Sequence, residues 1–366
     1  MNLQEKVKNL TTSPGVYLMR DSLGNVIYIG KAKNLKNRVK TYFQGSKNIS
    51  PKVEKLVKNL KDFDYITTDT EFEAFILECK LIKELKPMYN RLMKSPLSYI
   101  YIVIKTGQTY RIIETSNVMT ENDNNIYFGP YQSKNTVERA LQGIKECYKI
   151  ACSNSMKRNT SCLNHSLGLC VGMCINDSAV EYYNSIVKKI ISFLNGDDMS
   201  ILEDLNHKMQ EATEKLDFET AARYRDYIKS AYSLVNRAKT IRFAESSNNI
   251  LLAEQLTKGV IKIFLVKRNI ILFSKKYMLD SIGLEQLKKV IKRHIIVFFG
   301  NGCVSSFPDH VGKEEIDEAQ IIFHYLKSKP DSYVFIPQYW LNDNTGAQID
   351  EAIDTLLHQQ LNSSLS

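Results

Sequence analysis

Apolar residues follow a strand-like pattern in two short runs near the N-terminus, and this pattern predicts a β-hairpin. The runs are Val16–Met19 and Val26–Ile29, and residues 21–25 lie between them. Within that segment, Gly24 and Asn25 are residue types that adopt the positive φ angles of a chain reversal. We therefore expect two antiparallel strands with Gly24 and Asn25 at their turn.

The spacing of apolar residues changes to that of a helix over residues 71–87. Apolar side chains recur there three and four positions apart, and Pro87 ends the pattern. Glu78 lies within this stripe, whereas Glu73 falls on the polar side. A carboxylate on a core-facing stripe is costly unless a cation compensates it, so we predict that Glu78 binds a metal ion or pairs with a lysine. The stripe comprises Ala74, Phe75, Leu77, Leu81, Ile82 and Leu85.

Two further patterns predict the fold of the later part of the chain. Residues 202–238 are rich in Glu, Lys, Ala and Arg, and Asp217 can cap a second helix there, which predicts a helical hairpin. Residues 240–366 alternate between strand and helix patterns, as in an α/β domain. We predict strands at 260–266, 269–274, 295–299 and 333–336, helices at 283–292 and 316–328, and a hairpin turn at 267–269.

The length of 366 residues is too great for one ordinary domain. We predict an α/β multidomain protein with a small α/β domain at 1–95, a cysteine-rich linker domain at 96–195, the hairpin at 196–238 and a C-terminal α/β domain at 239–366. No run of about 18 apolar residues predicts a membrane span, and the N-terminus lacks the apolar core of a secretory signal. We therefore expect a cytoplasmic protein whose seven cysteines are reduced or bind metal.

The excess positive charge lies in the N-terminal part of the chain. Residues 1–105 hold 19 Lys and Arg against 10 Asp and Glu, a net charge of +9 that equals the formal net charge of the whole chain. A concentrated basic field attracts a polyanion by releasing condensed counterions. A solvated face that keeps the protein soluble is the alternative. The densest part comprises Lys31, Lys33, Lys36, Arg38, Lys40, Lys47, Lys52, Lys55 and Lys58.

Groups suited to phosphodiester chemistry gather on and after the predicted hairpin. Tyr17 and Tyr28 can lie close together across it, beside Gly30 and Lys31, and Arg38 follows two helical turns after that lysine. A small apolar core needs none of these groups, whereas a site that handles a phosphodiester could use all of them.

The ordered set of these motifs resembles the GIY-YIG nuclease domain. Its wider context, residues 13–38, is similar to the N-terminal domain of the UvrC family, the nuclease subunit of bacterial nucleotide excision repair. The resemblance implies a short antiparallel sheet with flanking helices and a metal-dependent DNA endonuclease. The matching elements are Gly15-Val16-Tyr17, Tyr28-Ile29-Gly30-Lys31, Arg38, Tyr42, Glu78 and Asn90.

The resemblance also implies a role for each matching residue. Glu78 would hold one Mg²⁺ or Mn²⁺ ion, which binds a phosphate oxygen. Tyr17 would help to deprotonate the attacking water, which requires nearby cations because a free phenol has a pKa of about 10. Lys31 would help to lower the pKa of a phenol.

Three of the remaining matching residues would contact the phosphate or the attacking water. Tyr28 and Tyr42 would position phosphate or water. Arg38 would offer its planar guanidinium to the scissile phosphate as negative charge accumulates there. Asn90 follows an abrupt exit from the predicted helix, which returns its amide towards the same site.

Four cysteines form a second candidate site, because four thiolates on a short segment suit a zinc ion or an iron–sulfur cluster. UvrC proteins carry a similar group after a Phe-Gly-Pro-Tyr string, present here at 128–131, and the resemblance implies a [4Fe–4S] cluster. The first gap is shorter than in the family, and Met173 stands where a proline is expected, so zinc and free thiols stay open. The four are Cys152, Cys162, Cys170 and Cys174, spaced C-x9-C-x7-C-x3-C.

The predicted helical hairpin resembles the UVR motif that the UvrB and UvrC families share. The matching string runs from Met209 to Asp226. The resemblance implies that this motif binds UvrB through an apolar contact with a polar rim. A helix pair that packs on its own domain is the alternative. The implied contact residues are Phe218, Ala221 and Ala222, with Arg225 and Asp226 at the rim.

These features together predict a UvrC-like protein with one nuclease centre. We expect it to bind UvrB and damaged double-stranded DNA, and to cleave the DNA, by resemblance, on the 3′ side of the lesion. Family members continue into a ribonuclease-H-like nuclease and helix-hairpin-helix repeats, so this chain is expected to be a shortened homologue that lacks both. The alternatives are a non-catalytic DNA-binding adaptor that recruits UvrB and a GIY-YIG endonuclease that acts on branched DNA outside excision repair.

Overall fold

The structure, a computed structural model, divides the chain into two compact units. The first joins Met1–Pro96, the N-terminal domain, with Phe243–Ser366, the C-terminal domain, and the second is Leu97–Arg242. No described helix is long and apolar enough to cross a membrane. The described residues are 3–44, 50–90, 99–106, 111–120, 123–151, 161–246, 248–300, 315–342 and 346–362.

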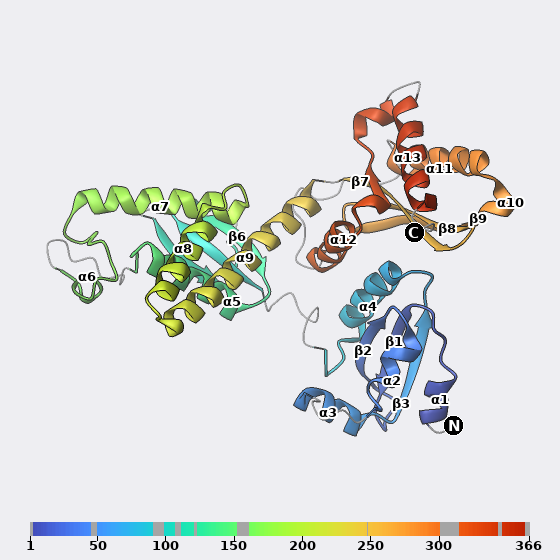
Figure 1. The fold of residues 1–366 in the computed structure, drawn as a ribbon, viewed down its shortest axis with the longest axis horizontal. Coiled ribbons are helices and arrows are strands. Elements are labelled where there is room, and N and C mark those ends of the chain that lie inside the picture. The colour runs from blue at the N-terminus through green and yellow to red at the C-terminus, as the bar shows by residue number, and fades with distance from the viewer. Residues whose placement is uncertain are drawn as a thin grey trace. The chain divides into compact units, whose positions relative to one another are not determined.

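The N-terminal domain is built on a three-stranded antiparallel sheet (Figure 1). Its strands are β1 (Gly15–Arg20), β2 (Val26–Ala32) and β3 (Asp62–Thr67), in the order β2-β1-β3. The predicted hairpin is confirmed, and Gly24 has the expected positive φ of 81°. The positive φ predicted for Asn25 is wrong, since among the described residues of this turn only Gly24 has one; the Asn25 N–H donates to the Asp21 carboxylate at 2.9 Å.

Helices cover both faces of this sheet. On one face the core includes residues of α1 (Leu3–Lys8), α2 (Leu35–Lys40) and α3 (Pro51–Asn59), and on the other it includes residues of α4 (Glu71–Leu85). Because side chains alternate between the faces of a strand, neighbouring residues of β1 enter different cores. Tyr17 and Met19 pack with Leu35, Val39 and Leu56, whereas Val16 and Leu18 pack with Ala74 and Ile82.

The helix α4 is buried on two sides, whereas the sequence predicted one apolar stripe. Ala74 and Ile82 of the predicted core-facing stripe are buried and pack against the sheet, but Leu85 is 44% exposed. A second stripe at helical spacing is buried, and its first two members pack in a core with residues of the C-terminal domain. A single-helix pattern cannot assign two apolar stripes to two different partners. The second stripe comprises Phe72, Ile76 and Cys79.

The first turn of α4 carries a capping box. The Thr70 hydroxyl accepts the Glu73 N–H, and the Glu73 carboxylate accepts the Thr70 N–H, both at 3.1 Å. This pair satisfies two of the backbone donors that a helix start leaves free. Glu73, predicted on the polar side, is half-buried and pairs with Lys262 of the C-terminal domain.

The C-terminal domain contains a four-stranded antiparallel sheet in the order β10-β7-β8-β9. One core joins the sheet to α11 and α13, and another joins it to α12 and to α4 of the N-terminal domain. The strands are β7 (Asn249–Thr257), β8 (Val260–Lys267), β9 (Ile270–Met278) and β10 (Tyr333–Phe335). The helices are α10 (Leu279–Ile282), α11 (Leu284–Phe299), α12 (Ile316–Ser328), α13 (Ala347–Asn362) and the short η2 (Pro330–Ser332) and η3 (Gln338–Asn342).

The strand predicted at 295–299 is wrong, because these residues are the last turn of α11. Ile295 and Phe299 continue a buried row, four residues apart, that begins at Leu287 and Ile291. Ile296 and Val297 are each half exposed. The other strands and helices predicted here are confirmed, with the hairpin turn at 267–269, while β7 and α13 were not predicted.

The second unit combines a three-stranded sheet with helices. The sheet has the order β5-β4-β6, and the predicted helical hairpin is confirmed by α8 and α9. Asp217 caps α9, since its carboxylate accepts the Thr220 N–H at 3.0 Å. The elements are β4 (Ile100–Lys105), β5 (Ile112–Ser116), β6 (Ile126–Tyr131), α5 (Lys134–Cys147), α6 (Leu163–Ser166), α7 (Asp177–Asn195), α8 (Ser200–Glu214) and α9 (Phe218–Glu245).

Candidate active site

Three tyrosine side chains form a cluster in the N-terminal domain. Tyr17 lies on β1, Tyr28 on β2, and Tyr42 two residues after α2. Their ring centroids are 5.9, 6.2 and 6.4 Å apart, and the Tyr17 and Tyr42 hydroxyls are hydrogen-bonded at 2.8 Å. The two tyrosines predicted to meet across the hairpin therefore lie together, and Tyr42 joins them.

Gly15 and Gly30 of the motif stand where no side chain fits around Tyr17 and its strand. Tyr17 pairs with Gly30 across the hairpin, and a Cβ atom on Gly30 would lie 2.3 Å from the Tyr17 hydroxyl oxygen. A Cβ atom on Gly15 would lie 2.2 Å from the backbone oxygen of Ile66 on β3. Both distances are far below van der Waals contact, so any larger residue would displace Tyr17 or separate two strands.

Asn90 is attached to the free edge of β2. Because β2 is an edge strand, alternate residues direct their backbone N–H and C=O groups away from β1. The Asn90 side chain accepts the Ile29 N–H and donates to the Ile29 oxygen, both at 2.9 Å, and the Tyr89 N–H donates to Ile27. Asn90 thus satisfies the backbone groups that a neighbouring strand would bind, and its predicted place in the catalytic set stays a prediction.

Glu78 reaches the same edge from α4. Its Oε1 atom accepts the Lys31 backbone N–H at 3.1 Å. Burial raises the pKa of the Glu78 carboxyl, against the smaller effects of this hydrogen bond and of the Lys31 and Arg38 charges. Burial also raises the pKa of Tyr28, and the Glu78 charge adds to that shift. The Glu78 charge therefore acts on Tyr28 of the tyrosine cluster, and the Arg38 charge acts on Glu78.

The two predicted cations of the site occupy different places. The Arg38 guanidinium lies 5.5 Å from the centroid of the Tyr42 ring, and its charge acts to lower the pKa of Tyr17 and Tyr28. The Lys31 ammonium instead lies 3.1 Å from the centroid of the Phe75 ring on α4. The Arg38 charge therefore acts on these phenols, and the effect expected of Lys31 on a phenol stays a prediction.

The protonation state of Tyr17 follows from its burial. Tyr17 is 1% exposed, and burial raises its pKa well above the usual value, with Tyr42 and Tyr28 adding to the shift and Arg38 opposing it. The phenol is therefore neutral near physiological pH. A neutral phenol can orient a water or a phosphate by hydrogen bonding, but it does not by itself accept a proton.

The surroundings of Glu78 fit a divalent cation held by one carboxylate. Mg²⁺ keeps several waters and needs only one or two protein carboxylates beside substrate phosphates. Among the described residues no lysine or arginine forms an ion pair with Glu78, and the Lys31 ammonium lies 4.0 Å from Glu71 instead. The same part of the chain contains no group of three or more His, Cys, Asp or Glu that could hold a metal ion.

Comparison with known proteins identifies the family. Residues 13–91 match the UvrC-like GIY-YIG domain, residues 99–193 the middle domain of the UvrC/Cho excinucleases, and residues 200–233 the UvrB/uvrC motif. These matches follow one another and cover more than half of the chain. The UvrABC system protein C of Clostridium perfringens strain 13 is 36% identical over 342 residues. The chain belongs to the UvrC family.

The UvrC relatives are longer than this chain. The alignment with the C. perfringens protein covers 92% of this chain and 55% of the relative, and that with UvrABC system protein C of Alkaliphilus oremlandii, at 34% identity over 343 residues, covers the same shares. The chain thus spans about half the length of the curated relatives it matches. A solved structure of the GIY-YIG N-terminal endonuclease domain of UvrC from Thermotoga maritima, bound to its catalytic divalent cation magnesium, is 36% identical. The match covers 25% of this chain and 100% of the T. maritima chain, with a TM-score of 0.23.

The cysteine group of this UvrC-family chain lies partly within the described residues. Cys162 precedes α6, the Cys170 sulfur accepts the Gly172 N–H at 3.5 Å, and Cys174 is buried. Among the described residues these thiols form no metal-binding group, and Cys152 lies outside those residues. The [4Fe–4S] cluster or zinc ion on the four cysteines stays a prediction.

The helical hairpin that matches the UvrB/uvrC motif exposes its turn. Phe218, the first residue of α9, is 65% exposed, and Ala221 and Ala222 are partly exposed. Arg225 and Asp226 hydrogen-bond to each other at 3.1 Å on the same turn of the helix. Leu216, which was not predicted as a contact residue, is 72% exposed beside Phe218; its place in the sequence motif was the available signal.

Proposed function

We propose that this UvrC-family chain is a metal-dependent DNA endonuclease of nucleotide excision repair, whose GIY-YIG centre cuts on the 3′ side of a lesion together with UvrB. The observation that carries the proposal is the place of Glu78. The Glu78 carboxylate, half-buried and without an ion pair to any described residue, lies at the edge of β2, where its charge raises the pKa of Tyr28 and the Arg38 charge acts to lower its own pKa. A carboxylate that is largely withdrawn from solvent without an ion pair, and whose pKa is raised, is typical of sites that bind a cation.

Each residue of the site has a chemical role in this proposal. Glu78 would hold Mg²⁺ or Mn²⁺, which when bound polarises the phosphate and lowers the pKa of a bound water. Arg38 balances the negative charge that accumulates on the phosphate during cleavage. Tyr17, Tyr28 and Tyr42 orient the phosphate and the attacking water as neutral phenols.

The remaining two residues of the predicted site support the geometry around Glu78. The Lys31 backbone N–H binds the carboxylate, and the Lys31 side chain packs on α4. The Asn90 amide holds the β2 edge to which that N–H belongs. Both therefore act on the position of Glu78 and the strand rather than on the substrate.

A basic cavity beside the tyrosine cluster supports DNA as the substrate. It has a volume of about 280 Å³ and lies between the start of α3 and the segment after α4. The Lys52 ammonium on its wall is 6.0 Å from the centroid of the Tyr28 ring. Lysines beside the scissile phosphate would bind the neighbouring phosphates of the strand. The lining residues are Pro51, Lys52, Lys55, Met88 and Tyr89.

The exposed end of the UVR hairpin supports UvrB as the partner. Phe218 and Leu216 present apolar surface at the turn, and Arg225 with Asp226 supplies a polar rim. A large exposed aromatic side chain with a polar surround is typical of a protein contact. Binding of UvrB would therefore depend on Phe218.

The cysteine segment carries a separate proposal, a [4Fe–4S] cluster or a zinc ion on Cys152, Cys162, Cys170 and Cys174. Its support is the resemblance of the spacing to that of the family and the suitability of four thiolates as ligands. The visible absorption spectrum and the metal content of anaerobically purified protein distinguish iron–sulfur, zinc and free thiols.

The test of the nuclease proposal is the variant Glu78→Ala. With UvrB and Mg²⁺ or Mn²⁺, the parent protein is expected to nick a lesion-containing duplex, and Glu78→Ala to lose cleavage by about 10³-fold while its affinity for DNA persists. Glu84→Ala is the matched control, because Glu84 is an exposed carboxylate on the same helix. Normal cutting by Glu78→Ala contradicts the metal assignment. DNA and UvrB binding without cleavage by the parent protein would favour the adaptor function.

A further inference from the structure

The helix that carries Glu78 is held between two domains. Ala74, Glu78 and Ile82 lie four residues apart on the side that faces the N-terminal sheet. Phe72 and Ile76 lie on the opposite side, 0% and 6% exposed, in a core with residues of β7, β8 and α12. Successive residues of an α-helix are rotated by about 100°, so these two rows point in nearly opposite directions.

The apolar part of this contact is built around Phe72. Its ring centroid lies 4.6 Å from that of Tyr325 on α12 and 5.4 Å from that of Phe264 on β8. The Phe264 ring is perpendicular to it, at 89°. Edge-to-face and tilted aromatic contacts of this kind fix the relative orientation of the elements that carry them.

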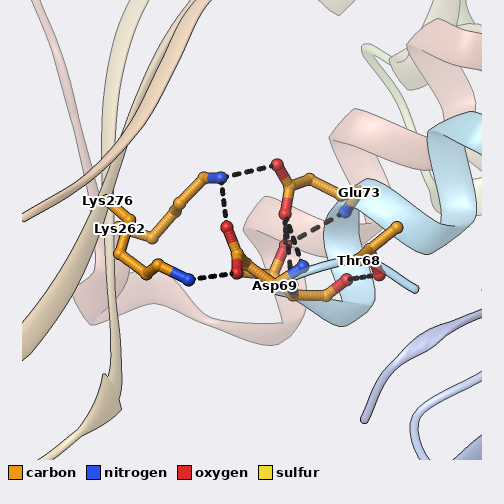
Figure 2. A network of polar contacts seen from close by, with 6 residues as sticks. Thr68, Asp69, Glu73, Lys262 and Lys276 are labelled. Atoms are coloured by element: carbon orange, nitrogen blue, oxygen red, sulfur yellow. Dashed lines mark hydrogen bonds and ion pairs between the residues drawn. The ribbon is translucent and has the colours of Figure 1, made fainter.

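The polar part of this contact lies at the start of α4, and Figure 2 shows its ion pairs and hydrogen bonds. Lys262 of β8 contacts Asp69 at 2.7 Å and Glu73 at 2.9 Å, and its side chain is only 8% exposed. Lys276 of β9 contacts the other oxygen of Asp69 at 2.7 Å. Glu73 at the same time closes the capping box with Thr70. The first turn of α4 is therefore tied to the C-terminal sheet through its own cap.

A second ion pair fixes the other half of the helix. Lys83 contacts Glu318 of α12 at 2.5 Å, and the two side chains are 24% and 13% exposed. Glu73 and Lys83 lie five residues before and five residues after Glu78. At a rise of about 1.5 Å per residue, both contacts act within about 8 Å of Glu78 along the helix axis.

We propose that the C-terminal domain is a positioning element of the nuclease centre, in which Lys262 and Glu318 hold α4 where Glu78 meets the Lys31 amide and binds a divalent cation. This inference rests on the proposed function, since it assigns to two residues of another domain a part in the same metal site. Lys262 is a buried cation with two carboxylate partners, Asp69 and Glu73, so its ammonium group is held in one position relative to the start of α4.

The first test is a charge swap across the second ion pair. The dissociation constant of Mn²⁺ is measured by electron paramagnetic resonance on the full chain without DNA, for Lys83→Glu, Glu318→Lys and the double variant. If the ion pair holds α4 in place, each single variant displaces the helix and weakens Mn²⁺ binding by about fivefold or more, and the double variant restores the binding. A direct effect of charge would instead move the two single variants in opposite directions, and that result overturns the proposal.

A matched control comes from the C-terminal domain itself. Lys292 and Asp350 form an ion pair at 2.7 Å between α11 and α13, and neither belongs to the core that α4 enters. The same swap at Lys292 and Asp350 is expected to leave the Mn²⁺ dissociation constant unchanged. An equal loss there would mean that the effect comes from general destabilisation, and it too would overturn the proposal.

The second test uses Lys262, with Lys262→Arg as the conservative variant. Lys262→Met is expected to weaken Mn²⁺ binding and to speed amide hydrogen exchange in α4 but not in β1, while Lys262→Arg retains most of the affinity. Unchanged Mn²⁺ affinity in Lys262→Met and in both swap variants overturns the positioning role and leaves the proposed nuclease intact. Unchanged Mn²⁺ affinity in Glu78→Ala would instead remove the metal site itself, so the two failures are distinguishable.

Discussion

The start and the middle of α4 place carboxylates in opposite electrostatic settings. At the start, hydrogen bonds from Lys262 and then Lys276 lower the pKa of Asp69, and Glu73 shares Lys262. In the middle, burial raises the pKa of Glu78, and the described residues offer it one backbone N–H and no ion pair. A paired carboxylate stabilises the fold, whereas an unpaired one costs stability and stays available to a ligand. The difference separates the structural acids of this helix from the one suited to bind a cation.

The largest expected effect compares the cation beside the tyrosine cluster with a cation beside Asp69. Arg38→Gln removes the guanidinium beside the tyrosine cluster and is expected to lower single-turnover cleavage by about 10²- to 10³-fold. Lys276→Gln removes an exposed cation that contacts Asp69 and is expected to change cleavage by less than about twofold. Equal losses of cleavage in the two variants would contradict the distinction between a cation of the catalytic site and a cation that supports the fold.

The second expected effect is that removing the charge of Glu78 and removing that of Glu73 change the free energy of unfolding in opposite directions. At pH 7 without divalent cations, Glu78→Gln replaces a half-buried charge that has no ion pair among the described residues, and it is expected to raise the free energy of unfolding by about 0.5–2 kcal/mol. Glu73→Gln removes a partner of the buried Lys262 and is expected to lower it by about 1–3 kcal/mol. Thermal unfolding monitored by circular dichroism measures both, and shifts of the same sign would contradict the comparison.

The smallest effect is the pH dependence of these differences. The raised pKa of Glu78 means that its ionisation opposes folding, so the gain in Glu78→Gln disappears as the pH falls through the folded pKa towards the usual 4.5. The lowered pKa of Asp69 means that its contribution is present above the usual 3.8 and is lost only below it. Lowering the pH should therefore abolish the gain in Glu78→Gln before the loss in Asp69→Asn, as unfolding temperatures across the pH range would reveal.

Local patterns predicted the hairpin and the helical elements because their information is local. The alternation around Gly24 and the cap at Asp217 depend on neighbouring residues only, and both are present. Residues 295–299 misled the same reasoning, because a short run of β-branched and aromatic residues fits a strand as well as a buried helix end. The spacing of Ile295 and Phe299 from the preceding row decides for the helix.

The second face of α4 could not be predicted from the helix alone. Phe72 and Ile76 are apolar, but the surface that covers them comes from residues about 180 to 250 positions later. The place of the Lys31 ammonium was hidden for a similar reason, since its charge suggested a phenol as its neighbour while the fold offers the Phe75 ring. Motif spacing identified the groups that gather at the site, and tertiary packing decided which cation meets which ring.

The way in which Asn90 completes β2 has a consequence for how this protein behaves in a crowded cell. Bare strand edges invite pairing with other chains, which leads to aggregation or exchange of segments between molecules. Here an amide side chain and a glutamate occupy the outward groups of Ile29 and Lys31. A strand of another chain would have to displace Glu78 to pair there. The residues that prepare the centre for a cation therefore also block edge pairing at β2.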